Sequence, residues 1–324
     1  MPPFASIIIL SRNQFDSDTR PCLDSLLSDC ENREAEIIVV DNGSDQVTQN
    51  GLNKYEGIPN LRIIRNSQDI GFSAANNIGI QASSGKAVVL LNNDTIVPKG
   101  EVRKMAVLLE GHPEWGALGP VSNSVGNEQG IWTSGTSVED ILLEGKEWKR
   151  KAKGSFLETN QLSFFCVALP RETVDTVGLL DEHFSPIYYE DVDYCLRISS
   201  SGKRLVIAEE VFVYHRGSAT MSKQPKRTRS LMSANKKKLL QKHGDVELIH
   251  KREVNLRALN AYLKKVEQEA PAISCELQFR FDNRIKIADS ELPRGLLKRW
   301  RYRRRLNAVA DLWKATIGRN KISG

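Results

Sequence analysis

The stretches Ala5–Leu10 (ASIIIL) and Glu36–Val40 (EIIVV) decide the fold class of this chain. Each is a short run of mostly β-branched, apolar residues that ends at polar residues. Leu61–Ile64 (LRII) and Ala87–Leu91 (AVVLL) follow the same rule further along. Continuous apolar runs of this length are typical of strands that are buried on both faces of a parallel sheet. We therefore expect four such strands in the first hundred residues.

Helical patterns separate these strands. In Arg20–Cys30 the apolar side chains recur at helical spacing, and Ser73–Ala82 (SAANNIGIQA) is a second helical stretch. The order strand, helix, strand, helix, strand predicts a doubly wound, Rossmann-like α/β sheet flanked by helices. Such sheets bind their ligands at the carboxyl ends of the strands.

Three polar clusters directly follow the expected strands, and that rule selects them as a site. They are Ser11-Arg12-Asn13, Asp41–Asp45 (DNGSD) and Asn92-Asn93-Asp94. Any one of them could be a solvated turn. Three clusters that share this chemistry and this position indicate a binding site.

The side chains of these clusters suit a nucleotide and a metal ion as ligands. Asp41 can accept hydrogen bonds from a base imide or a ribose hydroxyl. The chain has no Walker-type glycine loop and no G-x-G-x-x-G after its first strand, so a divalent cation is the simplest means of neutralising phosphates. Asp94 is a hard oxygen ligand suited to Mg²⁺ or Mn²⁺. His215 ends another apolar run (VFVYHRG) and could add a nitrogen ligand, or could be a structural hydrogen-bonding residue.

A second acidic site lies in the run FSPIYYEDVDYCLR, residues 184–197. Glu190, Asp191 and Asp193 stand between two apolar segments. Carboxylates held against apolar surface are costly to ionise unless the protein uses them. The alternative is a helix N-terminus, where acidic side chains complement the helix dipole.

The net charge of +6 over 324 residues is unevenly distributed. Residues 294–324 carry ten Lys or Arg and the single acid Asp311, whereas the rest of the chain has a net charge of −3. A near-neutral body with a basic tail suggests a polyanionic surface as partner. The five cysteines are scattered, which favours reduced thiols in a cytosolic protein. The sequence shows neither a signal peptide pattern nor a membrane span, so we expect a cytoplasmic protein.

Five motifs occur together and in order: Asp41-Asn-Gly-Ser44; Asn66 with Gly71-Phe72, Asn76-Asn77 and Gly79; Leu91-Asn-Asn-Asp-Thr95; Glu190-Asp-Val-Asp193; and Tyr214-His215. Over about residues 4–220 this series resembles the inverting family 2 glycosyltransferases of the GT-A fold, in the bacterial rhamnosyltransferase-like branch. The resemblance implies a mixed sheet and a nucleoside-diphosphate sugar donor.

The resemblance also implies a role for each matched residue. Asp191 would be the catalytic base, with Glu190 and Asp193 as supporting acids. Asp94 and His215 would hold the cation on the diphosphate. The donor would be bound by Ser11, Asn13, Asp41, Asn66, Gly71, Asn76, Asn92 and Asn93.

This chain departs from the family pattern at one point. Members often carry Asp-any-Asp where this chain has Asn92-Asn93-Asp94. A single carboxylate remains, and Asn92 is left either as a weak neutral metal ligand or as a ribose contact.

The remaining segments are less informative. Pro120–Asn160 looks rich in loops, and could cover the active site and select the acceptor or be an ordinary surface insertion. Residues 225–244 and 252–268 have helical spacing. We therefore divide the chain into a catalytic domain at 1–220, with a nucleotide-sugar half at 1–100 and an acceptor half at 101–220, and a helical extension at 221–324.

The basic tail, residues 294–324, has an amphipathic pattern. From Tyr302 onward, an apolar stripe is formed by Leu306, Val309, Trp313 and Thr316. A basic amphipathic helix with tryptophans fits the surface of an anionic membrane. The alternative is a helix packed on the protein with a solvated basic face. Nucleic acid is a poorer partner because no nucleic-acid-binding motif accompanies the charge.

Together these features predict a metal-dependent, inverting glycosyltransferase of bacterial surface polysaccharide assembly, peripheral on the inner face of the plasma membrane. Its acceptor would be a saccharide or a lipid-linked saccharide. One alternative is a nucleotidyltransferase-like enzyme, which would need a Gly- and Lys-rich phosphate loop. The other is an inactive nucleotide-sugar- or polyanion-binding protein, against which Asp94, Asp191 and His215 stand.

Overall fold

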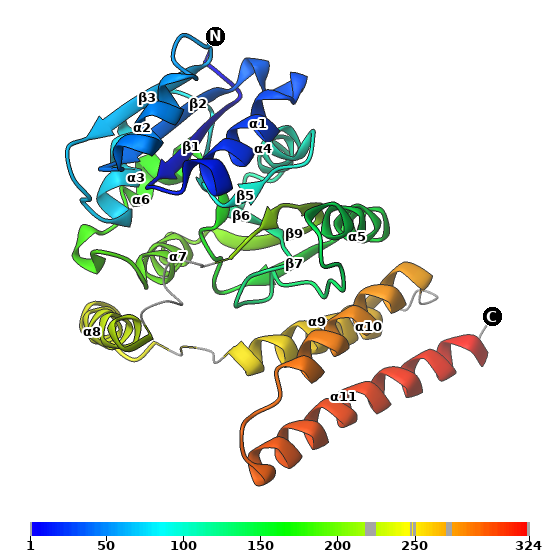
Figure 1. Ribbon diagram of the computed structural model, residues 1–324. Helices are drawn as coiled ribbons and strands as arrows, with labels where there is room; N and C mark the ends of the chain where they lie inside the picture. The colour runs from blue at the N-terminus through cyan, green and yellow to red at the C-terminus, as the bar shows by residue number, and fades with distance from the viewer. Residues whose placement is uncertain (1, 218–224, 247, 249–250, 270–273, 323–324) are drawn as a thin grey trace.

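The chain folds around one mixed sheet, with four helices after it (Figure 1). The computed structural model describes residues 2–217, 225–246, 248, 251–269 and 274–322. The sheet has eight strands in the order β3-β2-β1-β4-β8-β6-β9-β7. The strands are β1 (Ala5–Ser11), β2 (Glu36–Asn42), β3 (Leu61–Asn66), β4 (Ala87–Asn92), β6 (Trp115–Val121), β7 (Phe156–Thr159), β8 (Cys166–Pro170) and β9 (Arg204–Phe212). A separate antiparallel pair is formed by β5 (Thr95–Ile96) and β10 (Tyr214–His215).

The four strands expected from the sequence are confirmed and run parallel to their neighbours. β1 pairs with both β2 and β4, and β2 pairs with β3. The other half of the sheet is mixed, because β8 is antiparallel to both β4 and β6. Consequently the carboxyl ends of β1, β2 and β4 meet at one edge, where the polar clusters of the sequence lie.

Seven helices accompany the sheet. They are α1 (Arg20–Leu27), α2 (Gln46–Asn53), α3 (Phe72–Ala82), α4 (Glu101–Gly111), α5 (Val138–Lys151), α6 (Arg171–Val177) and α7 (Glu190–Ser200). The first expected helix ends three residues early, at Leu27, and a 3₁₀ turn over Cys30–Glu34 follows. Helix α2 was not expected because it buries only Thr48, Gly51 and Leu52, too few positions to show a period.

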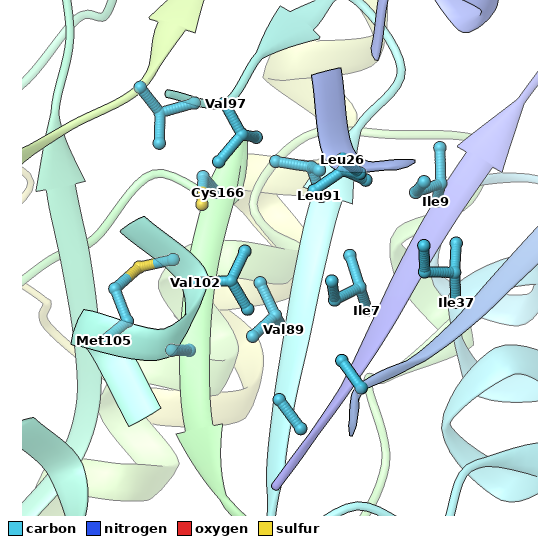
Figure 2. Close-up of a cluster of buried hydrophobic side chains, with 14 of the residues drawn as sticks. Ile7, Ile9, Leu26, Ile37, Val89, Leu91, Val97, Val102, Met105 and Cys166 are labelled. Carbon is cyan, nitrogen blue, oxygen red and sulfur yellow. The ribbon is translucent and has the colours of Figure 1, made fainter. Parts of the chain in front are cut away.

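The core occupies both faces of the sheet. Ile7 and Ile9 point into one apolar cluster, and Ile8 points into the other, as alternation along a strand requires. Figure 2 shows the first cluster, where Val89 and Leu91 of β4 meet Val102 and Met105 of α4. Burial on both faces explains why these strands read as unbroken apolar runs. All five cysteines are free thiols, as expected.

Residues 120–160 are rich in loops over 122–137, as expected, but the segment as a whole contains more regular secondary structure than the sequence suggested. They contain the end of β6, the 14-residue helix α5 and strand β7. Helix α5 escaped notice because it fully buries only Gly145 and Trp148. Trp148 is 1% exposed, and its indole nitrogen donates to the Glu209 carbonyl oxygen at 2.8 Å.

Four helices form the C-terminal extension: α8 (Pro225–His243), α9 (Lys251–Glu269), α10 (Cys275–Ser290) and α11 (Leu296–Ile322). The expected apolar face of α9 is confirmed, because Leu256, Leu259, Leu263 and Val266 are all buried. Helix α11 lies on the side of α9 and α10 that faces away from the sheet (Figure 1). No helix of the described residues is long and apolar enough to cross a membrane.

The expectation that the apolar stripe of α11 lies on a membrane is wrong. Tyr302, Leu306 and Trp313 are buried against α9 and α10 in a cluster of their own. The Trp313 ring stacks on Phe281 with a centroid distance of 4.0 Å, and its indole nitrogen donates to Gln278. The apolar stripe of α11 therefore packs on apolar side chains of α9 and α10 in the same chain.

A buried ionic cluster joins the extension to the sheet. Glu209 of β9 is fully buried and contacts Arg280 at 2.7 Å and Arg284 at 3.2 Å, both from α10. Tyr262 of α9 donates a short hydrogen bond to the same carboxylate. Burial opposes ionisation of Glu209, but Arg284 and Arg280 hold its pKa below the usual range. Removing one partner from such a cluster leaves a buried charge uncompensated, so the extension and the sheet should unfold together.

Candidate active site

Asp94 and His215, predicted as metal ligands from far apart in the sequence, lie side by side. Asp94 follows β4 and His215 ends β10, which pairs with β5 directly after Asp94. The Oδ1 atom of Asp94 is 3.2 Å from Nε2 of His215, and both side chains are largely buried. Two-stranded pairing of β5 and β10 therefore creates the juxtaposition.

The surroundings of His215 determine which ring nitrogen faces Asp94. Nδ1 lies 2.7 Å from the Ser124 carbonyl oxygen, which can only accept, so Nδ1 carries the proton. The ring stacks on Phe165 at 5.0 Å, and Asn123 bonds both backbone groups of His215. In the neutral ring, Nε2 then directs a lone pair at a carboxylate oxygen. Two acceptors at this distance need a cation between them, either a proton or a metal ion.

The chemistry of the pair fits a divalent cation. Across the described residues, no group of three or more His, Cys, Asp or Glu side chains is arranged to hold a metal. Two protein ligands are nevertheless the pattern found where substrate phosphates and water complete the coordination of Mg²⁺. The donor set of one carboxylate and one oriented imidazole is therefore suited to a metal that arrives with a diphosphate.

Asn92 and Asn93 directly precede Asp94 in the chain, but their hydrogen bonds go to other residues. Asn93 donates its amide to Thr19 at 2.9 Å, and Thr19 lies 2.9 Å from the Ser11 hydroxyl. This chain of hydrogen bonds connects the ends of β1 and β4. The Asn92 carbonyl oxygen accepts from Thr95 and from the thiol of Cys22, so the backbone of Asn92 is occupied in the turn.

A carboxylate that the sequence did not suggest also lies near Asp94. Asp18 is buried and forms an ion pair with Arg216, whose backbone nitrogen donates to the Asp94 carbonyl oxygen. Burial raises the pKa of Asp18, and the negative charge of Asp94 raises it further. A cation at Asp94 would therefore also be felt by Asp18.

The residues expected at the nucleotide base lie together at the ends of β1 and β2. Ser11 and Asp41 are register partners across these strands. The Asp41 carboxylate is buried and accepts from the Ser44 backbone nitrogen at 3.1 Å. Asn13 has a positive φ of 56° and bonds Ser44 and Asp45 through its backbone and side chain. The two loops thus hold each other in one conformation.

Asn66 and Gly71 belong to a neighbouring network. Asn66 donates to Asn42 at 3.1 Å, and Asn42 donates to Asp69 at 2.7 Å. Asp69 in turn accepts from the backbone of Gly71 and pairs with Arg12 at 2.5 Å. A side chain at Gly71 would meet Ser185, and its φ of 89° favours glycine. Gly71 thereby brings the donor side against the loop that precedes the acidic helix.

Asn76, predicted as a donor contact, is placed differently. It is 2% exposed and donates its amide to the Phe72 carbonyl oxygen within α3. Its neighbour Asn77 is also buried and ties α3 to the backbone of Leu180. The amide nitrogens of both asparagines are therefore occupied inside the protein. We take Asn77 as a structural residue, whereas the donor contact expected of Asn76 stays a prediction.

Glu190 and Asp191 begin helix α7 but have different environments. Glu190 is 5% exposed and its Oε2 atom is buried without a hydrogen-bond partner among the described residues. Asp191 is half-buried and lines a cavity. Burial raises the pKa of Asp191 to about 6. Burial and then the charge of Asp191 raise the pKa of Glu190 well above its usual range. Asp191 is thus the carboxylate that can both reach a ligand and take its proton.

The backbone before these acids is strained. Tyr188 and Tyr189 have φ of 84° and 73°, a left-handed conformation that is uncommon for bulky residues. Asn235 of α8 supports this turn. Its buried amide nitrogen donates to the carbonyl oxygens of Phe184, Ile187 and Tyr188 at 2.9, 3.0 and 3.1 Å. A residue of the extension thus holds the loop that positions Asp191.

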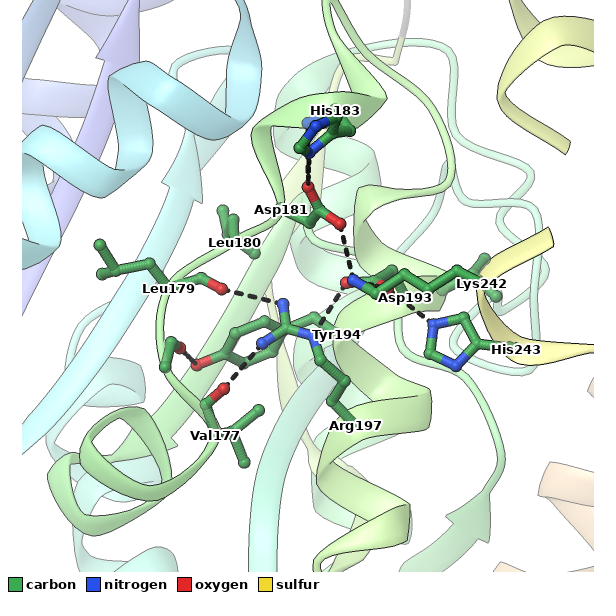
Figure 3. Close-up of polar contacts among 12 residues, drawn as sticks. Val177, Leu179, Leu180, Asp181, His183, Asp193, Tyr194, Arg197, Lys242 and His243 are labelled. Carbon is green, nitrogen blue, oxygen red and sulfur yellow. Dashed lines mark hydrogen bonds and ion pairs between the residues drawn. The ribbon is translucent and has the colours of Figure 1, made fainter. Parts of the chain in front are cut away.

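Asp193 ties the acidic helix to α8, as Figure 3 shows. Its carboxylate is fully buried and accepts from Lys242 and His243 at 2.7 Å and from Arg197 at 2.9 Å. Burial opposes its ionisation, but these bonds and the Arg197 charge hold the pKa of Asp193 below its usual range. Lys242 also binds Asp181 at 2.6 Å. Asp193 therefore supports the helix and is unavailable as a base.

The cavity beside Asp191 has a volume of about 630 Å³ and lies between the sheet domain and the extension. The sheet side contributes Asn127, Thr159 and Gln161 as well as Asp191, and the extension contributes His243, Asp245, Val254 and Arg257. Amides, a hydroxyl and a guanidinium are groups that hydrogen-bond sugar hydroxyls. Arg257 is half-buried, and its positive charge acts on the carboxyl of Glu128, which also lines the cavity.

A family model decides the relationship of this chain to known proteins. The model described as Glycosyl transferase family 2 matches residues 6–174, just over half of the chain. The chain belongs to glycosyl transferase family 2. The match includes the Asp41 and Asp94 loops and ends before Asp191 and His215.

Relatives and solved structures agree with this assignment. The O-antigen biosynthesis protein RfbC of Myxococcus xanthus is 28% identical over 228 residues, 67% of this chain and 18% of RfbC. The amylovoran biosynthesis glycosyltransferase AmsE of Erwinia amylovora is 21% identical over 225 residues, 67% of this chain and 77% of AmsE. The mannosyltransferase PcManGT from Pyrobaculum calidifontis, solved with GDP-Man and Mn²⁺, has a TM-score of 0.56 at 17% identity, over 99% of this chain and 87% of that one.

These matches cover very different shares of the relatives' own lengths. The chain spans a quarter of the length of one further relative and less than a fifth of RfbC. The structural likeness, at 17% identity, shows that the two proteins share the GT-A-like fold.

Several residues of this family 2 site could not be found from the sequence. Ser124 and Asn123, which orient His215, lie in a segment expected to be loop. Asn235, Lys242 and His243 act from a helix outside the family match. In the sequence, Lys242 and His243 stand in the last turn of an expected helix. Basic residues at that position do not reveal that their partner is an acid far away in the sequence.

Proposed function

We propose that this chain is an inverting glycosyltransferase that moves a sugar from a nucleoside diphosphate to a saccharide acceptor. The observation that carries the proposal is Asp191, a carboxylate of raised pKa on the wall of a polar cavity. The three loops at the carboxyl ends of β1, β2 and β4 supply the donor side. Direct displacement of the nucleoside diphosphate by an acceptor hydroxyl requires a base on the acceptor side and nucleotide-binding loops on the donor side.

Asp191 takes the acceptor proton in this mechanism. A sugar hydroxyl is too weak an acid to ionise unaided, so a carboxylate must remove its proton as the oxygen attacks. The Asp191 Oδ1 atom accepts from the Val192 backbone nitrogen at 2.8 Å, which fixes the carboxylate orientation. Attack from the face opposite the departing diphosphate inverts the anomeric carbon.

Asp94 and His215 would hold a divalent cation, Mg²⁺ or Mn²⁺. When bound, the cation offsets the negative charge that develops on the leaving diphosphate. Ser11, Asn13 and Asp41 would bind the nucleoside, and the network of Asn66 and Gly71 would support that loop. Mn²⁺ in the solved mannosyltransferase supports the metal assignment.

The acceptor would occupy the cavity between the two parts of the chain. We assign residues 1–220 to the catalytic domain and 221–324 to the extension, with the cavity at their junction. The relatives named for O-antigen and amylovoran biosynthesis support a role in bacterial surface polysaccharide assembly. A lipid-linked acceptor and a rhamnosyl donor are the finer assignments that we propose.

A donor screen tests this function. UDP-, GDP- and dTDP-sugars are offered with Mn²⁺ and simple saccharide acceptors, and nucleoside diphosphate release is measured. We expect one nucleotide class to be preferred and Asp191→Asn to abolish acceptor-dependent release. The anomeric configuration of the product is then read from its proton coupling constants. Product with the donor's own anomeric configuration would refute the inverting mechanism.

A further inference from the structure

The first turns of α11 carry a cluster of exposed apolar side chains. Leu296, Leu297 and Trp300 are 89%, 61% and 57% exposed. Val47, Val107 and Leu143 are exposed to a similar degree but stand on three separate helices, and Leu312, which is 45% exposed, lies further along α11. We call Leu296, Leu297 and Trp300 the α11 patch. Grouped exposure of this kind marks an interaction surface, whereas single exposed apolar residues do not.

The α11 patch is distinct from the buried stripe of the same helix. At about 100° per residue, Leu296 and Trp300 fall on one side of α11. Tyr302 and Leu306 fall about 120° further round the helix, where both are buried against α9 and α10. Helix α11 is therefore apolar on two faces at its beginning, and packing within the chain satisfies only one of them. Figure 1 shows that this end lies far from β1, β2 and β3.

A dense positive field surrounds the α11 patch. Seven of the ten cations of the tail lie in residues 294–305, and no acid lies between 292 and 310. Arg305 pairs with Glu253 and Arg303 approaches Asp289. Of these seven cations, five are exposed and have no ion-pair partner among the described residues, namely Arg294, Lys298, Arg299, Arg301 and Arg304. Arg304 lies over the Trp300 ring at 5.6 Å.

The surface beside the α11 patch is hollowed. A hollow of about 500 Å³ between the end of α10 and the start of α11 is lined by Arg294, Leu296 and Arg299, and also by Asp289. Two guanidinium groups beside an apolar side chain can bind a phosphate whose carbon chain lies on the leucine. The hollow thus combines the two kinds of contact that a phospholipid offers.

We propose that the α11 patch docks on an anionic phospholipid bilayer, with Leu296, Leu297 and Trp300 at the acyl boundary and the surrounding cations on headgroup phosphates. Tryptophan, leucine and cations in this order suit a membrane interface. A second copy is a poor occupant because two such patches would bring like charges together. Nucleic acid would leave the leucines without a partner. This inference rests on the proposed function at one point only: docking on a membrane would bring the enzyme to a lipid-linked acceptor.

The first experiment removes the apolar part. The full chain is sedimented with vesicles of phosphatidylcholine, with and without phosphatidylglycerol, in the absence of donor and acceptor. We expect binding to the anionic vesicles alone, weakened about tenfold or more by Leu296→Ser, Leu297→Ser and Trp300→Ser together. The matched control is Val47→Ser, Val107→Ser and Leu143→Ser, which removes three exposed apolar side chains elsewhere. The control should bind like the unaltered protein.

The second experiment removes the charge. Arg294→Gln, Lys298→Gln, Arg299→Gln and Arg301→Gln together should weaken binding about tenfold or more, and binding should fall with added salt. The control neutralises four other exposed cations: Lys54→Gln, Lys99→Gln, Lys146→Gln and Lys153→Gln. Equal losses in both variants would show attraction by net charge alone and would overturn the docking site.

A spectroscopic measurement locates the contact. Trp300 fluorescence should shift to the blue on anionic vesicles, and Trp300→Phe should remove the shift while retaining most of the binding. Circular dichroism confirms that each variant is folded. Unchanged vesicle binding by the apolar triple variant would overturn the proposal, as would a dimer that this variant splits. Donor turnover measured without vesicles is independent of all these outcomes, so failure of docking and failure of the proposed function are separate results.

Discussion

His215 Nε2 lies 3.2 Å from Asp94 Oδ1, while Nδ1 is committed to the Ser124 carbonyl oxygen. The geometry leaves a lone pair facing a carboxylate, so a cation is needed between them. The backbone pairing of β5 and β10 holds the two residues next to each other. We propose that this arrangement is preorganised for a metal ion bound to the donor diphosphate.

Asp94→Asn and His215→Gln should each weaken Mn²⁺-dependent binding of the nucleoside diphosphate about tenfold or more, since each removes one of the two proposed protein ligands. Calorimetry with and without Mn²⁺ measures the effect. Asp16→Asn, which removes an exposed carboxylate, is the control. If a proton rather than a metal bridges the pair, EDTA will leave binding and activity unchanged, and the metal assignment is wrong.

Asp191→Asn should lower kcat by about 10² or more and leave donor binding intact, because the amide keeps the side-chain shape but cannot take a proton. With the pKa of Asp191 raised to about 6 by burial, kcat/KM of the unaltered enzyme should rise with pH through about 6. Glu190→Gln is the comparison. A larger loss in that variant than in Asp191→Asn would transfer the role of base to Glu190.

The raised pKa of Asp191 also has a consequence for stability. A carboxyl with a higher pKa in the folded than in the unfolded state binds more protons when folded, so its contribution falls as pH rises. Above about pH 6 the folded protein bears the full cost of the charged, buried group. Asp191→Asn should therefore raise the melting temperature at pH 8, and the gain should shrink toward pH 4. Asp311→Asn, at an exposed position, should show no such pH-dependent gain.

Much of the donor side could be predicted from the sequence because it is formed by single strands and by the loops that directly follow them. The strands of residues 5–10, 36–40 and 87–91 are buried on both faces, which produces unbroken apolar runs, and their polar ends mark the binding edge. Asp94 and His215 were paired by resemblance, and β5–β10 pairing brings them together. Motif matching alone does not show that Asn76 donates its amide to Phe72 within α3.

The acceptor side could not be predicted because its contacts are distant in sequence. Asn235 bonds carbonyl groups 47 to 51 residues earlier, and a buried amide leaves no periodic pattern. The tail was misread for a related reason. Amphipathic spacing shows that the stripe of Leu306 and Trp313 is buried, but not whether lipid or α9 and α10 cover it.

Asn235→Ala should lower kcat about tenfold while leaving the KM for the donor unchanged, because it frees the strained turn of Tyr188 and Tyr189 rather than the nucleotide loops. Asn235→Asp should be worse than the alanine variant, since it places a carboxylate oxygen against three carbonyl oxygens. Steady-state kinetics with varied donor measure the effect, and Asn50→Ala on the exposed side of α2 is the control. A matching rise in KM for the donor would mean that Asn235 acts through general loosening of the fold.

Arg284→Met tests whether the extension is part of the folding unit. Arg284 is fully buried against Glu209, so its loss leaves a buried carboxylate with fewer partners and should cost about 3–5 kcal/mol of unfolding free energy. Urea unfolding followed by circular dichroism should show one transition at a lower midpoint. Arg305→Met breaks an exposed pair with Glu253 and should cost about 1 kcal/mol or less. Two separate transitions, with only one moved by Arg284→Met, would show that the extension folds independently of the sheet.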